Sequence, residues 1–191
     1  LNYAKRIQTL LMPDEDEVIS KFSDAFILLR PKDIVSGDFY WYKDVETEGH
    51  TKQIIAAVDS TGHGVPGALM SMIGLEQFPE IVTLEGIQEA NLILDRLHKG
   101  VVRILKQESS KNRDGMDLAV CTINHKTKVL EYAGAKNPLV YIRDGKLHTI
   151  KGDRQPIGYV ASLGAHKPFT KHEISFQEPT TIKDEPAAMT L

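Results

Sequence analysis

The sequence predicts an α+β domain with mainly antiparallel sheets, and the order of its predicted elements supports this class. Strand-like apolar runs come first, two helical patterns follow between about residues 65 and 107, and further strand-like runs come after them. This order differs from the regular alternation of strands and helices in a parallel α/β fold. The 191 residues, of which 41% are hydrophobic and 26% charged, suit one domain with a substantial core.

The first twelve residues are expected to form a helix that leads into the domain. Helical spacing relates the apolar residues Tyr3, Ile7, Leu10 and Leu11, and the pattern stops before the acidic run DEDE. Because a helix this short is marginal in water, the side chains of Ile7, Leu10 and Leu11 must pack on something. Leu1 in place of Met indicates that the chain was cut from a longer protein. We therefore expect a linker helix at 1–12, a domain at 13–182 and a tail at 183–191.

Three strand-like segments are expected before the first helix of the domain. Residues 25–29 and 39–42 are apolar and partly aromatic, and the run IIAAV at 54–58 suits a strand that is covered on both faces. If 38–42 and 54–58 pair as a hairpin around the loop KDVETEGHTKQ, Asp38 and Asp59 lie at the same end of the sheet.

Helices and later strands complete the predicted order. A helix is expected at about 65–78, with Pro66 in its first turn, and another at about 87–107. The apolar positions of the second helix are Ile87, Ala90, Leu94, Leu97, Val101 and Ile104. After the polar loop ESSKNRDG, the strand-like runs are MDLAVCTI, VLEYAGA, LVYIR and KLHTI, the last two joined by the hairpin signal Asp144-Gly145.

The overall charge argues against several classes of partner. The net charge of -3 and the pI of about 6.2 give no basic field for nucleic acid or anionic lipid. The chain has no apolar run of the ~18 residues that a membrane span needs. Its one cysteine, Cys121, lies in an apolar run and is expected to be a buried hydrophobe. We expect a cytoplasmic protein without membrane insertion.

Two aspartates at predicted strand ends are the main candidates for a metal site. Asp59 follows a buried run and precedes a Gly-rich turn, which together offer the hard oxygen ligands that Mg2+ and Mn2+ prefer. Asp38 would lie beside it, and two carboxylates at one strand edge repel each other unless a cation lies between them. The alternatives are an Asp59 that caps the turn and an Asp38 that only begins a strand.

The turn after Asp59 could also bind an anion. Gly62, His63 and Gly64 precede a predicted helix, where free N–H groups and the helix dipole attract negative charge. His63 could serve as a ligand or acid–base group, or as a turn residue bonded to the backbone. The chain has no GxxxxGK[ST], HExxH, CxxC or GxSxG motif, so the chemistries of those motifs are not expected.

Five segments in order resemble one family, and they are PKDIVSGDFYW, AAVDSTGHGVPGALMSMIG, RDGMDLAVCTI, LEYAGAKNPLVYIRDG and IKGDRQPIGY. From about residue 4 to 176, the chain resembles the phosphatase domain of the stage II sporulation protein E type. This is a bacterial branch of the metal-dependent protein serine/threonine phosphatases (PPM, type 2C). The resemblance implies an αββα sandwich of two mainly antiparallel sheets flanked by helices. It also implies two Mn2+ or Mg2+ ions at the sheet edge.

The resemblance implies Asp38 and Asp59 as metal ligands and catalytic residues, joined by the carbonyl of Ser60. The implied reaction is attack of a metal-activated water on phosphoserine or phosphothreonine in a bacterial regulatory protein. Strand-end Asp117 and Asn137 are expected to support the site. Residues that could contact the substrate are Lys32, Gly62, His63, Gly64, Asn137 and Arg154. We further expect an upstream sensor domain in the parent protein, with the helix at 1–12 as its relay, and a homodimer.

The C-terminal segment departs from the family pattern. The family resemblance implies a later TDG-like motif and a final pair of aspartates as further metal ligands, but the chain here reads HEISFQEPTTIKDEPAAMTL. Asp184 has tail-like neighbours and is not assigned as a ligand. Because two aspartates offset only two of the four charges of two divalent cations, we expect the chain to bind metal weakly and to hydrolyse phosphoester slowly or not at all.

Two other functions stay open at this point. One is a regulatory module that recognises a phosphoprotein without hydrolysing it. The other is a metal-dependent hydrolase of small phosphoesters, which would cleave a chromogenic phosphate but no phosphoprotein.

Overall fold

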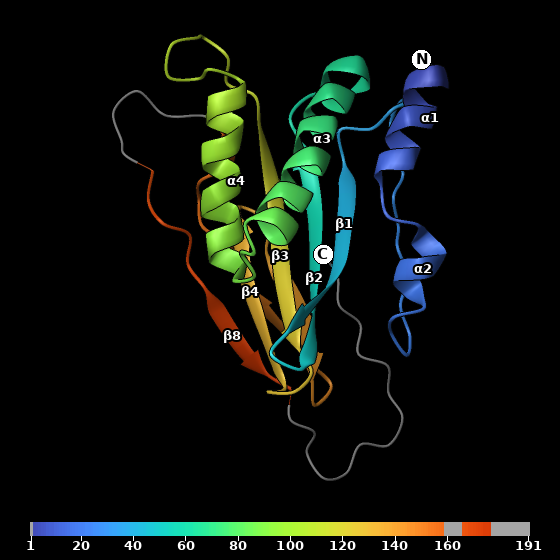
Figure 1. The fold of residues 1–191 in the computed structure, drawn as a ribbon, viewed down its shortest axis with the longest axis vertical. Helices are drawn as coiled ribbons and strands as arrows, with labels where there is room; N and C mark the ends of the chain where they lie inside the picture. Colours follow the sequence, from blue (N-terminus) through green and yellow to red (C-terminus); the bar gives the residue numbers. More distant parts are fainter. Residues whose placement is uncertain (1, 159–165, 177–191) are drawn as a thin grey trace.

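The main sheet is antiparallel and forms the centre of the molecule (Figure 1). The computed structural model describes residues 2–158 and 166–176, so the predicted tail with Asp184 lies outside the described residues. The strands of the main sheet are β1 (Phe39–Thr47), β2 (His50–Ser60), β3 (Gly115–Asn124), β4 (Val129–Ala135), β7 (Ile157–Gly158) and β8 (His172–Ser175). Their order is β1-β2-β3-β4-β8, with β7 paired to β3. The strands β5 (Leu139–Arg143) and β6 (Lys146–Ile150) form a separate sheet.

The long helices cover one face of the main sheet, as Figure 1 shows for α3 and α4. The helical elements are α1 (Asn2–Leu11), α2 (Glu15–Ile19), α3 (Gly64–Pro79), the π-helix η1 (Glu80–Leu84) and α4 (Ala90–Ile104). Antiparallel sheets combined with these helices confirm the predicted α+β class. Among the described residues, no helix is long and apolar enough to cross a membrane.

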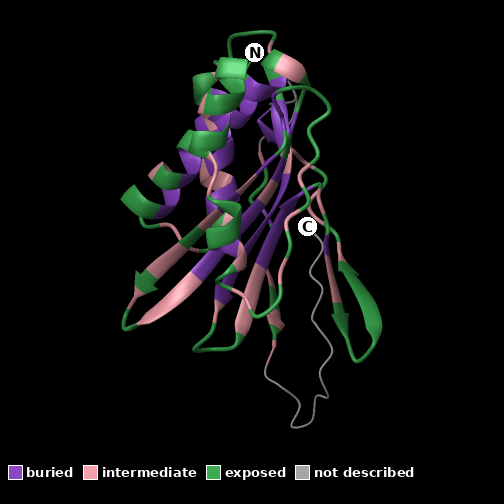
Figure 2. Ribbon diagram, turned by 90° about the vertical axis from the view of Figure 1, so that its right-hand side faces the viewer, coloured by how far each residue is buried: buried purple, intermediate pink, exposed green. Residues whose placement is uncertain are grey.

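The core lies between the sheet and these two helices (Figure 2). The apolar positions of α4 explain its packing, because Leu94, Leu97 and Val101 are fully buried, as their helical spacing predicts. The predicted bounds of 87–107 were too wide, since the helix begins at Ala90 and ends at Ile104. Ile104, the last of the predicted apolar positions, is 41% exposed at the end of the helix.

The opposite face of the main sheet packs against the small β5–β6 sheet. Here Ala119 and Cys121 from β3 form a buried cluster with Tyr132 of β4 and Leu139 of β5. Burial raises the pKa of the Cys121 thiol to about 12, which leaves it protonated and unreactive. The prediction of Cys121 as a buried hydrophobe is confirmed.

The β1–β2 and β5–β6 hairpins turn on residues with positive φ. The predicted pairing of 38–42 with 54–58 is confirmed by the register that sets Phe39 opposite Val58. The predicted loop KDVETEGHTKQ was wrong, because both strands continue to a turn at Glu48 and Gly49, with φ of 37° and 78°. Two residues with positive φ make the tight turn that antiparallel strands favour. The hairpin signal at Asp144-Gly145 is confirmed, with φ of 52° and 67°.

The segment before β1 differs from its prediction. Residues 25–29 form no strand, and Phe26 and Leu28 are 78% and 69% exposed. An apolar run becomes a strand only when a neighbouring strand bonds its backbone, and this run has no such neighbour among the described strands. The short helix α2 was not predicted. It begins at the N-cap Asp14, whose side chain accepts a hydrogen bond from the Glu17 N–H.

Helix α1 is held to the domain by a polar residue. The expected helix at 1–12 is found at Asn2–Leu11, but Tyr3 and Leu10 are 75% and 78% exposed. The expected packing of Leu10 is not found within the described residues. Instead, the Gln8 side chain is buried and donates to the Ser36 carbonyl and the Ser71 hydroxyl, each at 2.6 Å. The division of the chain at residues 12 and 182 stays a prediction.

Candidate metal centre

The sheet register brings three aspartates into one row. Asp59 lies directly opposite Asp117 in the β2–β3 pair. Asp38 comes one residue before Phe39, whose partner is Val58, so continuing that register sets Asp38 beside Asp59. Directly opposite residues of an antiparallel pair point to the same face. Asp117 alternates with Met116 and Leu118, which face the helices, so the row lies on the other face. We call Asp38, Asp59 and Asp117 the acidic row.

Glycine lets the loop before β1 approach the end of β2. A Cβ built at Gly37 would lie 2.9 Å from the Gly62 carbonyl oxygen and 3.1 Å from that of Ser60. These distances are shorter than ordinary contacts, so a larger residue here would push the two loops apart. The Asp38 N–H donates to the Ser36 hydroxyl at 3.0 Å, which fixes the backbone next to Gly37. Asp38 and the Ser60 carbonyl are therefore held at the same corner of the sheet.

The charges at this corner fit a cation. Partial burial and then the negative charge of Asp59 raise the pKa of Asp38, because the carboxylate form is disfavoured there. The Ser60 hydroxyl is buried and meets no hydrogen-bonding partner within the described residues. Carboxylate, carbonyl and hydroxyl oxygens are the ligands that Mg2+ and Mn2+ prefer. The adjacent carboxylates of Asp38 and Asp59, which we call the Asp38/Asp59 pair, are thus a fitting place for a divalent cation.

Asp117, the third aspartate of the row, forms an ion pair with a lysine of the chain. Lys136 Nζ lies 3.1 Å from Oδ1 and 3.2 Å from Oδ2 of Asp117. In the described part of the chain, no three His, Cys, Asp or Glu side chains come together as a metal-binding group. The row therefore divides into the Asp38/Asp59 pair and the Asp117–Lys136 ion pair.

The Gly-rich turn after β2 leads into α3, as its sequence suggests. Gly62 and Gly64 have φ of 89° and 62°, which glycine adopts without strain. His63 is the N-cap residue of α3 but makes no capping bond with its side chain. Its Nδ1 lies 2.9 Å from Oδ2 of Asp33, and the imidazole is 68% exposed. The N-terminus of α3 thus lies beside the corner of the sheet that holds Asp38 and the Ser60 carbonyl. The His63 side chain is turned toward Asp33.

The other predicted residues lie in loops around the sheet. Lys32 is exposed in the segment before Asp38. Asn137 is half-buried after β4, where its N–H donates to the Ala135 carbonyl and its own carbonyl accepts from the Tyr132 hydroxyl. Arg154 is exposed in the connection between β6 and β7. The roles of these residues toward a substrate stay predictions.

Comparison with known proteins assigns the family. The sequence profile of the family described as Stage II sporulation protein E (SpoIIE) matches residues 49–182, more than half of the chain. The chain belongs to the SpoIIE family. Among solved structures, the SiaA-PP2C domain of Pseudomonas aeruginosa is similar over 92% of this chain, with 28% sequence identity and a TM-score of 0.74. The predicted family and fold are therefore confirmed.

Two solved structures of lower sequence identity share the fold. The PP2C phosphatase domain of the cell fate determinant SpoIIE from Bacillus subtilis matches 75% of this chain with 16% identity and a TM-score of 0.54. RsbX in complex with magnesium matches 75% of it with 15% identity and a TM-score of 0.53. The chain spans 65%, 38% and 62% of the SiaA, SpoIIE and RsbX chains, respectively. The comparison with curated proteins gave no match.

Sequence reasoning missed two charged partners of this SpoIIE domain. Asp33 and Lys136 were not singled out, although Asp33 pairs with His63 and Lys136 with Asp117. A charged residue in a loop is usually solvated, so neither had a distinctive local pattern. A signal for Lys136 was available in the predicted strands, because continuing an antiparallel β3–β4 pairing sets position 136 beside position 117.

Proposed function

We propose that this chain is a divalent-metal-dependent protein serine/threonine phosphatase domain. The observation that carries this proposal is the Asp38/Asp59 pair at the sheet edge of a SpoIIE-family fold. Asp38 and Asp59 would hold Mg2+ or Mn2+, and the Ser60 carbonyl would lie beside the two carboxylates. The similarity to RsbX in complex with magnesium supports a metal-dependent reaction.

The residues around the pair suit a phosphoryl group. A divalent cation, when bound here, lowers the pKa of water and offsets negative charge on phosphoryl oxygens. The N–H groups at the start of α3, after Gly62 and Gly64, offer donors for an anion. The carboxylates of Asp38 and Asp59 would repel a phosphate from their own side of the site and leave it the side that faces solvent.

The substrate that fits best is a phosphorylated bacterial regulatory protein. The site is open, since Asp38 and Asp59 are both exposed, and it can therefore receive a loop of a folded protein. The SpoIIE neighbour is described as a phosphatase domain with a fragment of a regulatory domain and as a cell fate determinant, which supports a signalling role. We further propose that α1 joins the domain to an upstream sensor in a longer parent protein.

Hydrolysis of a phosphoserine peptide in millimolar Mn2+ tests this function, with Asp59→Asn and, as a control on the β5–β6 turn, Asp144→Asn. We expect slow turnover that chelation and Asp59→Asn remove, and that Asp144→Asn leaves unchanged. Turnover that survives chelation or Asp59→Asn contradicts the proposal. Cleavage of p-nitrophenyl phosphate without any phosphopeptide cleavage would instead favour a hydrolase of small phosphoesters.

One observation favours a second candidate function, a regulatory module that binds a phosphoprotein without hydrolysing it. Asp117, the third carboxylate of the acidic row, is paired with Lys136 and so is not free for a second cation. Phosphopeptide binding that is undiminished by chelation, in the absence of turnover, would support this candidate.

A further inference from the structure

We propose that Lys136 is a phosphoryl-binding residue of this site, whose ammonium donates directly to the phosphate held at the Asp38/Asp59 pair. This inference rests on the proposed function and names a substrate contact that the sequence patterns did not indicate. Its basis is the place of Nζ in the acidic row, the way in which the backbone holds Lys136, and the exposure of the side chain.

The ammonium lies in line with the proposed metal ligands. Continuing the β3–β4 register, in which Leu118 is opposite Ala135, sets Lys136 beside Asp117. Nζ contacts both oxygens of Asp117, which itself lies opposite Asp59. Because neighbouring strands are about 5 Å apart, Nζ is within about one or two strand spacings of Asp59. A phosphate is about one such spacing wide, so a phosphate bound between Asp59 and Nζ can touch both the cation and the ammonium.

The backbone of Lys136 is held in a conformation that lysine rarely adopts. Its φ is 63°, in the left-handed region, which is unfavourable for a residue with a side chain. The Lys136 N–H donates to the Asp153 carbonyl at 2.8 Å, and the Asp153 N–H donates to the Gly134 carbonyl at 2.8 Å. These two bonds fix the end of β4.

The side chain has donors left for a ligand. An ammonium has three N–H groups, and the contact with Asp117 does not enclose it, since the Lys136 side chain is 47% exposed. An incoming phosphate dianion would meet three carboxylates in the acidic row. A cation at one end and Nζ at the other would give the dianion positive charge on both sides. Charge-assisted hydrogen bonds of this kind are the strong ones.

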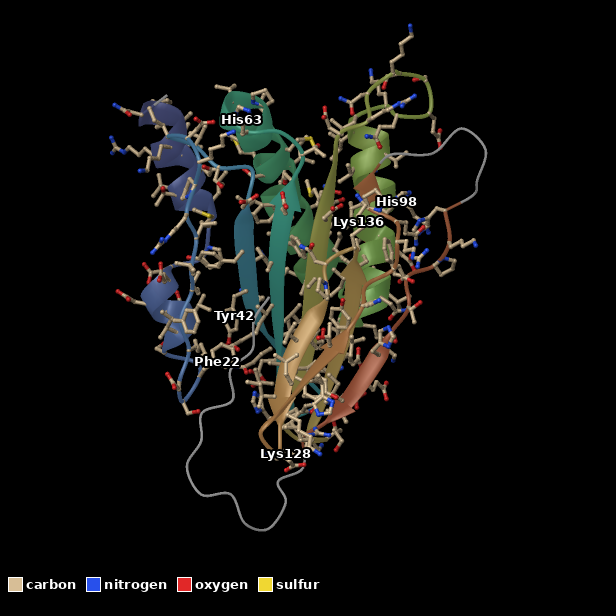
Figure 3. All side chains as sticks on the ribbon, turned by 180° about the vertical axis from the view of Figure 1, so that it is seen from behind. Phe22, Tyr42, His63, His98, Lys128 and Lys136 are labelled. Carbon is tan, nitrogen blue, oxygen red and sulfur yellow. The ribbon has the colours of Figure 1, made fainter. Side chains whose placement is uncertain are left out.

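Lys128 offers a matched control on the same strand. Figure 3 shows Lys136 and Lys128 at opposite ends of the sheet, and His63 at the end where Lys136 lies. Lys128 is also exposed and also has a positive φ, of 57°. It differs in its surroundings, because its Nζ lies 6.0 Å from the centre of the Phe176 ring and far from the acidic row.

The test measures binding, so that it does not depend on turnover. Titration calorimetry first gives the Mg2+ affinity of the parent chain, Lys136→Met, Lys128→Met and the double variant Asp117→Asn/Lys136→Met. Inorganic phosphate is then titrated into each Mg2+-loaded protein. The double variant removes one positive and one negative charge, so it keeps the net charge of the parent. Thermal unfolding checks that each variant is folded. If Lys136→Met does not fold, Lys136→Arg is tested in its place.

We expect Lys136→Met to raise the phosphate dissociation constant about tenfold, and the double variant to bind phosphate nearly as weakly. Lys128→Met should match the parent, and Lys136→Arg should lose less than Lys136→Met. Parent-like phosphate affinity in Lys136→Met overturns the inference alone. Restored affinity in the double variant also overturns it, because Lys136 would then only balance the charge of Asp117. A parent chain that binds no Mg2+ overturns the proposed function, and this inference with it.

Discussion

The acidic row and a second polar cluster, between α4 and the C-terminal segment, contain similar residues but differ in burial and in role. In that second cluster, Asp95 Oδ1 lies 2.9 Å from His166 Nε2 and accepts from the Phe169 N–H at 3.1 Å. The His166 ring stacks on His98 with the ring centres 4.0 Å apart. We call Asp95, His98 and His166 the histidine cluster. Its members are mostly buried, whereas Asp38 and Asp59 are exposed.

The difference shows when a group of titratable residues binds the chain and when it binds a ligand. In the histidine cluster, Oδ1 of Asp95 lies 2.9 Å from His166 Nε2 and accepts a hydrogen bond from the Phe169 N–H, so this carboxylate oxygen has partners in the segment that it holds. In the acidic row, three carboxylates meet one ammonium, and the Asp38/Asp59 pair keeps a repulsion that raises the pKa of Asp38. Buried groups that are paired support structure, and exposed groups with unmatched charge attract ions.

The largest expected effect concerns the histidine cluster and pH. Burial, followed by the neighbouring His166, lowers the pKa of His98 from 6.5 to about 4. The unfolded chain therefore takes up a proton near pH 6.5 while folded His98 stays neutral, and stability falls as the pH drops from about 6.5 to 4. At about 1.4 kcal/mol per pKa unit, His98 removes about 3 kcal/mol over this range.

Urea unfolding at pH 7 and at pH 4.5 measures this contribution. We expect His98→Gln to reduce the loss of stability between the two pH values. His148→Gln, on the exposed strand β6, is the control and should behave like the parent. An equal pH dependence in His98→Gln and the parent would contradict the assignment of His98 as a neutral, buried residue.

The next effect concerns the joint between α1 and the loop that carries Asp38. Gln8 Oε1 accepts from the Ser36 N–H at 3.0 Å, and the Ser36 hydroxyl in turn accepts from the Asp38 N–H. Gln8→Ala leaves the Ser36 backbone and Ser71 without these bonds. Because buried polar groups without partners cost about 1–3 kcal/mol, we expect a loss of about 2 kcal/mol in the free energy of unfolding.

Chemical denaturation of Gln8→Ala and Thr9→Ala tests this joint. Thr9 is exposed on the same helix, so its variant should change stability by less than about 0.5 kcal/mol. If Gln8→Ala is as stable as Thr9→Ala, the joint does not hold α1 to the domain. Weaker metal binding by Gln8→Ala would further show that the joint positions Asp38.

The sequence predicted the elements with strong local patterns and missed those that long-range contacts decide. The hairpin at Asp144-Gly145 and the buried face of α4 follow from residues close in sequence. Gln8 gave no such signal, because its partners Ser36 and Ser71 lie 28 and 63 residues away. The run 25–29 looks like a strand, but a strand also needs a neighbour, which no local pattern provides.

The candidate site shows the same division. The glycines and the strand ends predicted that Asp38 and Asp59 lie together, since both follow from one hairpin. The contact of Lys136 with Asp117 depends on the pairing of β3 with β4 and on a left-handed lysine backbone. A sequence pattern gives no indication of that backbone conformation, because glycine or asparagine is the residue expected there.

The most direct test of the central claim is titration calorimetry of the metal-binding step. Mn2+ is titrated into the parent chain, Asp59→Asn and the control Asp144→Asn at neutral pH. If the Asp38/Asp59 pair is the metal centre, Asp59→Asn removes a charge that the cation needs and raises the dissociation constant by about tenfold or more, or about 1.4 kcal/mol. Asp144→Asn should match the parent. Equal Mn2+ affinity in Asp59→Asn and the parent would contradict the account.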